Sequence, residues 1–442
     1  MMTKVLSRVG FLLLLAVAYA QPAAALQIER VVSPGGIEAW LIQDRSTPIL
    51  AIQAGFPGGA AQDPKGKDGV ANLLASMLDE GAGPYDSQAF QGKLENLSIE
   101  MSTDSDRDRF YVGMRMISDR RDEAVDLLAL ALAEPRFDQP ALERVRSSIL
   151  SQIQRDAENP QSIVWRSLWQ SLFPNHVYGR QSRGTAETVA ALSRDDLVQF
   201  HRARIVRDGM MIGVVGDITP EQLKPLLDKA FGRLPAKGTI EAVAEAKAEA
   251  PGTTTVIRRE IPQSVVAFGH FGIKRDDPDF YAAYIVNYIL GGGGFNSRLM
   301  EQVREKRGLA YSVSSQMATY DRAGLILGSV GTENGQAAKS LELIRAEWRR
   351  MRDEGPTDEE LANAKTYLTG SYALQLSSTS RIARNLVSIQ ADKLGIDYLD
   401  KRNSYIDKVT IADARRAAKR LYDPDKLTVV VVGNPANLAS TN

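Results

Sequence analysis

Hydrophobic and polar positions divide the chain into two stretches that repeat one order of patterns. Residues 49–56 and 265–271 are apolar runs of the kind that predicts a strand. Each run is followed by an apolar segment with helical periodicity, residues 69–80 and 279–290, and a glycine directly after each segment indicates a helix C-terminus. The two stretches are therefore predicted to begin with equivalent elements.

The same correspondence continues along both stretches. Each has a second helix, a two-strand segment, two long amphipathic helices and a closing apolar strand that ends at glycine. These are residues 87–97, 98–116, 122–133, 139–156 and 210–216 in the first stretch, and 296–306, 310–330, 336–353, 358–374 and 427–433 in the second. Such duplication indicates an internal repeat. We predict an α+β fold of two homologous domains, each an antiparallel sheet with helices packed on one face.

Residues 235–252 separate the two repeats. Alanine, glutamate and lysine dominate this segment, prolines bracket it, and it has few large apolar side chains, which is typical of a linker. The 442 residues of the chain also exceed the ~250–300 at which a single core stops growing. We therefore expect domains at residues 27–234 and 253–436.

The N-terminus has the pattern of a signal peptide. A basic start precedes an apolar run at residues 9–20, and small residues suit cleavage after Ala20 or Ala25. Because the run is shorter than the ~20 residues that span a bilayer, we expect cleavage of residues 1–25 rather than an anchor. The chain has no cysteine, and export without disulfides is compatible with a bacterial periplasm.

Residues 69–78, Gly-Val-Ala-Asn-Leu-Leu-Ala-Ser-Met-Leu, resemble the metal-binding helix of the insulinase (pitrilysin) family of zinc peptidases. In that family an H-x-x-E-H motif places two histidines on one helix face to hold zinc, and its glutamate activates water. On this alignment Asn72 and Ser76 replace the histidines, and Ala75 replaces the general base. The resemblance implies a helix that keeps the spacing of a zinc site without its chemistry.

The resemblance covers nearly all of the chain after the signal peptide. Four segments between residues 177 and 217 are similar to the end of the family's first domain, and residues 291–311 are similar to its second-domain signature. In the family a later helix of the first domain supplies a glutamate as third ligand. The alignment puts Val145 at that position, with Glu143 as the alternative if the register slips.

The polar stripe formed by Asn72, Ser76 and Asp79 also allows a purely structural interpretation, in which these side chains find hydrogen bonds inside a core. The chain has three histidines, His176, His201 and His270, and no two of them share a helical spacing. We therefore expect no second zinc site, and the histidines are interpreted as ordinary polar or capping residues.

Arg304 and Tyr311 lie seven residues apart across a predicted helix-to-strand turn at Gly308, and this spacing can bring their side chains together. Spacing alone favours a structural role, with Arg304 on a solvated face beside Glu301 and Glu305. In the insulinase family the equivalent arginine and tyrosine reach the active site from the second domain, bind the substrate carbonyl and stabilise the oxyanion. The resemblance implies the same role here.

Four consecutive glycines, Gly291, Gly292, Gly293 and Gly294, precede the second helix of the second stretch. The surrounding sequence has neither the P-loop nor the dinucleotide-binding pattern. We expect a flexible turn beside a substrate chamber.

In one branch of the insulinase family, two-domain chains pair around a chamber. The resemblance implies that this chain is a non-catalytic subunit of a periplasmic zinc endopeptidase of unstructured peptides. It would supply Arg304 and Tyr311 to a homologous partner that carries the zinc, and hold no metal itself. A homodimeric peptide-binding or scaffold protein without proteolysis and an independent peptidase with an unorthodox site remain alternatives. Because 54 Lys and Arg residues balance 54 Asp and Glu residues, charge gives no reason to expect nucleic acid or an anionic membrane as partner.

Overall fold

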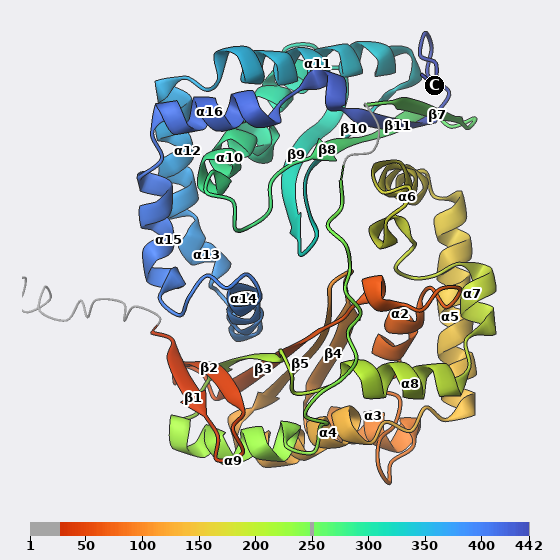
Figure 1. Cartoon of the computed structure of the whole chain (residues 1–442), viewed down its shortest axis with the longest axis vertical. Helices are drawn as coiled ribbons and strands as arrows, with labels where there is room; N and C mark the ends of the chain where they lie inside the picture. The colour runs from red at the N-terminus through yellow and green to blue at the C-terminus, as the bar shows by residue number, and fades with distance from the viewer. Residues whose placement is uncertain (1–26, 248–251, 442) are drawn as a thin grey trace, which may run out of the picture.

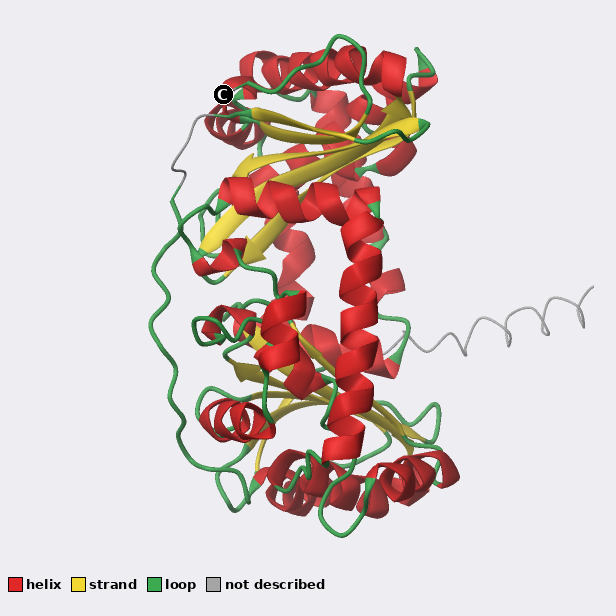
Figure 2. Ribbon diagram, turned by 90° about the vertical axis from the view of Figure 1, so that its right-hand side faces the viewer, coloured by secondary structure: helices red, strands yellow, loops and turns green. Residues whose placement is uncertain are grey.

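A computed structural model describes residues 27–247 and 252–441, so the predicted signal peptide at residues 1–25 lies outside the described part. The fold is mixed α+β, with two sheets and a layer of helices on the outer face of each (Figures 1 and 2). Within these residues no helix combines the length and the apolar character needed to cross a bilayer.

The first sheet has six strands in the order β1-β2-β6-β3-β5-β4, and neighbours are antiparallel except for the pair β2 and β6. The strands are β1 Glu29–Val32, β2 Glu38–Gln43, β3 Ile49–Pro57, β4 Glu100–Ser105, β5 Arg109–Ile117 and β6 Met211–Gly216. The helices are α2 Val70–Ala75, α3 Ser87–Asn96, α4 Arg121–Ala133, α5 Gln139–Glu158, α6 Pro160–Leu172, α7 Ala186–Ala191, α8 Arg194–Arg204 and α9 Pro220–Phe231.

The second sheet has five strands in the order β7-β11-β8-β10-β9, with β7 and β11 as the parallel pair. The strands are β7 Thr254–Arg258, β8 Gln263–Phe271, β9 Ala310–Tyr320, β10 Ala323–Glu333 and β11 Thr428–Gly433. The α-helices are α10 Phe280–Asn287, α11 Ala337–Glu354, α12 Asp358–Gly370, α13 Tyr372–Gln375, α14 Thr379–Ala391, α15 Tyr398–Asp407 and α16 Ile411–Leu421, and two π-helical turns are η5 Tyr288–Gly292 and η7 Met300–Glu305.

The two sheets repeat one topology. The order β2-β6-β3-β5-β4 of the first corresponds strand for strand to β7-β11-β8-β10-β9 of the second, including the position of the parallel pair. In the first half α2 to α5, α8 and α9 close the main core over the sheet, and α10, α11, α12 and α16 do so in the second. The predicted repeat of two α+β units is confirmed.

Each half also covers the inner face of the other half's sheet with one helix. Helix α6 packs on β8 and β11, and α14 packs on β3 and β6 (Figure 1). Leu168 of α6 joins a buried cluster with second-sheet residues, and Leu386 of α14 does so with first-sheet residues. This exchange explains why β11 is buried along its whole length. It adds a helical layer that the sequence pattern did not predict, because an apolar helix face does not specify which sheet it covers.

Two connections join the halves. Residues 235–247 run between them without helix or strand (Figure 1), and Gln62 holds this segment by exchanging hydrogen bonds with the backbone of Glu241, at 2.8 and 2.9 Å. The tip of the β9–β10 hairpin touches the first half, where Asp321 pairs with Arg109 at 2.7 Å and its backbone N–H donates to Asp108 at 3.0 Å. The predicted limits of the linker and domains stay predictions, since residues 248–251 lie outside the described part.

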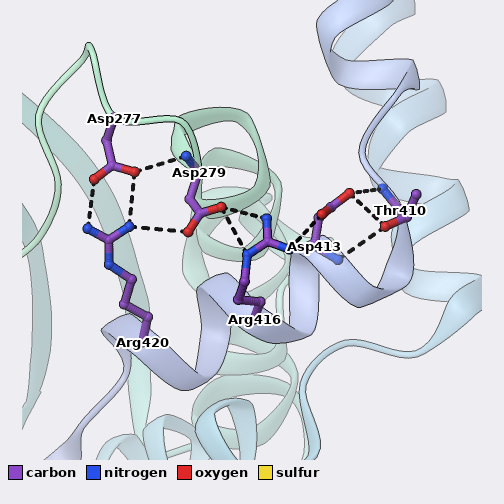
Figure 3. A network of polar contacts seen from close by, with 6 residues as sticks. All are labelled: Asp277, Asp279, Thr410, Asp413, Arg416 and Arg420. Carbon is purple, nitrogen blue, oxygen red and sulfur yellow. Dashed lines mark hydrogen bonds and ion pairs between the residues drawn. The ribbon is translucent and has the colours of Figure 1, made fainter.

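An ion-pair network fixes the start of α10 against α16 (Figure 3). Arg416 bonds the Asp279 carboxylate at 2.6 Å, and Arg420 bonds Asp277 at 2.7 Å. Arg416 also reaches Asp413 at 2.8 Å, and Asp413 in turn caps α16 with Thr410. The two arginines hold the pKa of Asp279 below its usual range. The helix that leads into the glycine run is thereby anchored at its N-terminal end.

Candidate functional site

Helix α2, which contains the substituted ligand positions, is held at its start by a buried carboxylate. Asp63 accepts hydrogen bonds from the backbone N–H groups of Gly69, at 2.6 Å, and Ala71, at 3.1 Å. Gly69 has φ 97°, a backbone conformation that residues other than glycine rarely adopt. Burial raises the pKa of Asp63 to about 7. The short helix therefore depends on an acceptor outside itself, and no local sequence pattern identifies Asp63 as that acceptor.

The helix ends earlier than predicted. It spans Val70–Ala75 rather than residues 69–80. The carbonyl of Ala75, its last residue, accepts the hydroxyl of Thr103 on the edge strand β4 at 2.6 Å. Ser76 is the C-cap, and its hydroxyl donates to the carbonyl of Asn72 at 3.0 Å. The predicted helical stripe of Asn72, Ser76 and Asp79 is wrong at its last member, since Asp79 lies beyond the helix.

The two registers considered for the third ligand position differ in their surroundings. Val145 on α5 is 7% exposed and lies in the core cluster that also contains Ala75. Glu143 lies on the exposed side of α5, where Gln139 donates to it at 2.7 Å and Arg146 at 3.2 Å. Glu143 is thus engaged by its own helix, and the position that faces the core holds an apolar side chain.

All three histidines have structural partners. His176 accepts the backbone N–H of Tyr178 at 3.1 Å and caps a short 3-10 turn. The ring of His201 bonds the carbonyl of Leu132 at 2.8 Å, and buried His270 accepts from the indole of Trp348 at 3.0 Å. Burial lowers the pKa of His201 and His270. Their interpretation as polar and capping residues agrees with these contacts.

Arg304 and Tyr311 lie close together in the second half of the molecule. Arg304 lies in the last turn of η7, Tyr311 is the second residue of β9, and the guanidinium carbon stands 5.1 Å from the centre of the phenol ring. Phe295 lies 4.6 Å from the same guanidinium. Tyr311 is 83% exposed and Phe295 63%. In the described residues Arg304 forms no ion pair, so the solvated pairing with Glu301 or Glu305 is not what the structure shows.

Both halves of the chain match models of one protein family. The family model described as Insulinase (Peptidase family M16) matches residues 40–186, and the one described as Peptidase M16 inactive domain matches residues 191–368. The chain belongs to the insulinase family, M16. A relative from Helicobacter pylori, named non-peptidase homolog YmxG, is 26% identical over 392 residues, 88% of this chain and 89% of the relative.

Two further similarities cover most of the chain. A Bacillus subtilis relative named uncharacterized zinc protease YmxG is 26% identical over 359 residues, 81% of this chain and 87% of the relative. The crystal structure of a peptidase M16 inactive domain from Pseudomonas fluorescens matches with a TM-score of 0.87 and 26% identity, over 94% of this chain and 100% of that one. Both halves of the fold are therefore of the M16 type.

The residues of this M16 chain do not form the zinc site that the resemblance to zinc peptidases implies. Asn72 and Ser76 offer an amide and a hydroxyl that is already bonded, Ala75 cannot activate water, and Val145 cannot bind metal. Among residues 27–247 and 252–441 no three His, Asp or Glu side chains gather closely enough to hold a metal ion. The chain is an inactive homologue of the M16 peptidases.

The M16 glycine run differs from the flexible turn that we expected. Gly291 and Gly292 belong to the π-helical turn η5, and a Cβ on Gly291 would come within 2.4 Å of the Ser315 hydroxyl on β9. Gly291 therefore permits close packing of η5 on the sheet. Gly294, with φ 57° and open space around it, is the position that turns the chain toward Phe295. The sequence analysis missed Phe295, although a phenylalanine directly after a glycine run was a usable signal.

Proposed function

We propose that this chain is the non-catalytic subunit of an exported M16 zinc endopeptidase. It supplies Arg304 and Tyr311 to the active site of a homologous, zinc-bearing partner chain that cleaves unstructured peptides. The observation that carries the proposal is the state of these two side chains: the guanidinium lies against an exposed phenol and has no ion pair in the described residues. A cation and a phenol held together in this way are donors suited to a developing oxyanion.

The position of the pair along β9 supports a role in trans. The tip of the β9–β10 hairpin contacts the first half at Asp108 and Arg109. Tyr311 lies ten residues before Asp321, and a strand rises about 3.3 Å per residue. The pair is therefore at the end of β9 that points away from the contact with its own first half, where a second chain can reach it.

The edge strand β4 supports binding of an extended peptide by the same complex. β4 pairs with β5 on one side, and its other edge is the border of the first sheet. An unpaired strand edge can accept a peptide as an added strand. The periplasmic location belongs to the proposal as well, and rests on the signal-like residues 1–25 together with the absence of cysteine.

Turnover in the reconstituted complex tests the proposal. The partner to use is a homologous chain from the same organism with an intact H-x-x-E-H motif. We expect Tyr311→Phe and Arg304→Ala to lower kcat by about 10²–10³, because each removes a positioned donor to the transition state. Gel filtration should show the complex intact, since neither side chain is part of a core.

Two controls give this test its meaning. The isolated chain should bind no stoichiometric zinc and cleave no peptide, and about one tightly bound zinc per chain would contradict the proposal. Lys306→Gln on the same turn removes an exposed cation that pairs with Glu301 at 2.7 Å, and kcat should stay within about twofold. Near-normal turnover of both site variants in an intact complex would leave the scaffold function as the better interpretation.

A further inference from the structure

A pocket of about 320 Å³ lies in the first half of the molecule. Its lining includes neither Asn72, Ala75 and Ser76 of α2 nor Arg304 and Tyr311. Its walls come from α5, α6, the loop at residues 179–184 and the turn between β4 and β5. Four arginines and two tryptophans line it: Arg107, Arg166, Arg180, Arg183, Trp165 and Trp169.

Two of the four arginines already have anionic partners inside the chain. Arg180 pairs with Asp68 at 3.0 Å, and Arg183 pairs with Asp156 at 3.0 Å. These carboxylates compensate two of the positive charges at the pocket.

The other two arginines, Arg107 and Arg166, form no ion pair in the part of the chain that the structure describes. The guanidinium carbon of Arg107 lies over Trp169, 3.5 Å from the ring centre. The Nε–H of Arg107 donates to the carbonyl of Tyr178 at 3.0 Å. Arg166 makes no hydrogen bond or ion pair with the described residues, and none with a carboxylate of the pocket. Burial lowers the pKa of Arg107, although the neighbouring Asp106 and Asp108 act in the opposite direction. The pocket therefore holds two guanidinium groups with N–H donors that an entering anion can accept.

The indole rings differ in what they can offer a ligand. Trp169 is covered by Arg107 on the ring face and stacks with Phe173 at 5.2 Å, so it serves to fix the guanidinium. Trp165 lines the pocket and forms no ring contact with another aromatic residue among those described. An apolar or aromatic group can pack against it beside the two cations. The ligand chemistry that fits is a carboxylate attached to a planar, apolar body.

We propose that this pocket binds the C-terminal carboxylate of a peptide whose last residue is aromatic. Its volume is at the lower end of the ~300–1,000 Å³ typical of ligand pockets, which suits a terminal residue better than a long segment. The lining residues are partly exposed, so the preceding peptide can leave toward solvent. The pocket lies within one chain, so the proposal does not depend on a catalytic partner.

Calorimetric titration of the isolated chain tests the ligand class. The probes are a short peptide that ends in phenylalanine, as free acid and as C-terminal amide, and N-acetylphenylalanine. We expect the free acid to bind about tenfold or more tighter than the amide, because charge-assisted hydrogen bonds are lost with the carboxylate. Equal affinity of acid and amide would overturn the proposal. Binding of N-acetylphenylalanine as tight as that of the peptide acid would assign the pocket to small free carboxylates instead.

Two variants and one matched control locate the site. Arg166→Gln should reduce the affinity for the acid to that for the amide, and Trp165→Leu should remove the preference for phenylalanine over alanine at the last position. Arg155→Gln is the control, because Arg155 lies on α5, bonds Gln152 at 2.8 Å and does not line the pocket. An equal loss in Arg155→Gln would show that diffuse charge, not the pocket, attracts the peptide.

Inorganic phosphate separates a specific site from a general anion site. We expect phosphate at millimolar concentration to compete weakly and the preference for an aromatic last residue to persist. Phosphate competition together with no residue preference would overturn the assignment to a peptide terminus. Thermal melting of each variant shows that it is folded, and Arg166 is chosen because it has no contact that the fold needs. A negative result here leaves the turnover test in the complex untouched.

Discussion

Helix α2 and the cluster of Arg304, Tyr311 and Phe295 have opposite surroundings, although the resemblance to the insulinase family aligns positions of both with catalytic residues. The substituted positions of α2 are absorbed into the fold: Ala75 is 2% exposed, its carbonyl accepts from Thr103, and the Ser76 hydroxyl bonds its own helix. Arg304 and Tyr311 remain open, with polar groups that bond nothing within the described chain. One region has become structural, whereas the other still presents donors.

The two regions also differ in what they contribute to the stability of the chain. The side chains around α2 contribute packing and hydrogen bonds, so stability alone accounts for them. Exposed arginine and tyrosine side chains contribute little to stability, so the core does not depend on this pair. A pair of exposed donors is what the proposed binding of a substrate carbonyl requires.

The largest effect on the free energy of unfolding should follow from placing a charged side chain in the core around α2. Ala75→Glu introduces a carboxylate at the aligned general-base position, but this position lies in the hydrophobic core around α2. We expect a loss of about 3–5 kcal/mol in the free energy of unfolding, measured by urea denaturation. Asn72→His, at a partly exposed position of the same helix, should cost less than about 1 kcal/mol. A stable Ala75→Glu variant would mean that α2 is less closely packed than described.

Adding Asn72→His, Ser76→His and Val145→Glu to Ala75→Glu completes the ligand set and tests its register. We expect weak zinc binding at best without Val145→Glu and stronger binding with it, because Val145 and not Glu143 faces the core. Metal analysis after dialysis measures this. If Glu143→Ala abolishes binding while Val145→Glu adds nothing, the third position is Glu143.

The pH dependence of stability should isolate Asp63, which holds the start of α2. Its folded pKa is about 7, raised by burial from 3.8, so its stabilising contribution is full below pH 3.8 and is lost as the pH rises through 7. The free energy of unfolding of wild type, minus that of Asp63→Asn, should therefore fall by up to about 4 kcal/mol between pH 3.8 and pH 8. A flat difference would show that Asp63 stays ionised in the folded chain.

Much of this comparison could be anticipated from the sequence. Apolar periodicity identified the internal repeat, the strands β3 to β5 and β8 to β10, and the closing strands β6 and β11, because these signals are local. It did not identify β1, β2 or β7. The convergence of Arg304 and Tyr311 followed from their spacing across a single turn. The substitutions at Asn72, Ala75 and Ser76 were visible as soon as a metal-binding pattern was available for alignment.

What could not be anticipated depends on partners distant in sequence. Thr103, which bonds the last residue of α2, lies 28 residues after Ala75. Asp63 holds the start of the helix through backbone groups that any residue possesses. The exchange of α6 and α14 between the sheets requires the arrangement of the two halves. The packing role of Gly291 depends on Ser315, so the glycine run alone suggested only flexibility.

A moderate effect is expected for Phe295, whose ring centre lies 4.6 Å from the guanidinium carbon of Arg304. If Phe295 holds the guanidinium in place, Phe295→Ala should lower kcat of the reconstituted complex about two- to fivefold, the size of an exposed cation–π contact. Phe295→Tyr keeps the ring and should restore turnover. An effect on KM alone would indicate direct contact with the substrate rather than positioning of Arg304.

The smallest effect should be that of substitutions in the exposed pair on the free energy of unfolding. Tyr311 is 83% exposed and makes no hydrogen bond in the described residues, and Arg304 has no ion pair there. We expect Tyr311→Phe and Arg304→Gln to change the free energy of unfolding by less than about 0.5 kcal/mol, as measured by urea denaturation of the isolated chain. A loss above about 1 kcal/mol would make the pair a structural feature like α2. Unchanged stability combined with a large loss of turnover in the complex requires that the two side chains act on something outside this chain.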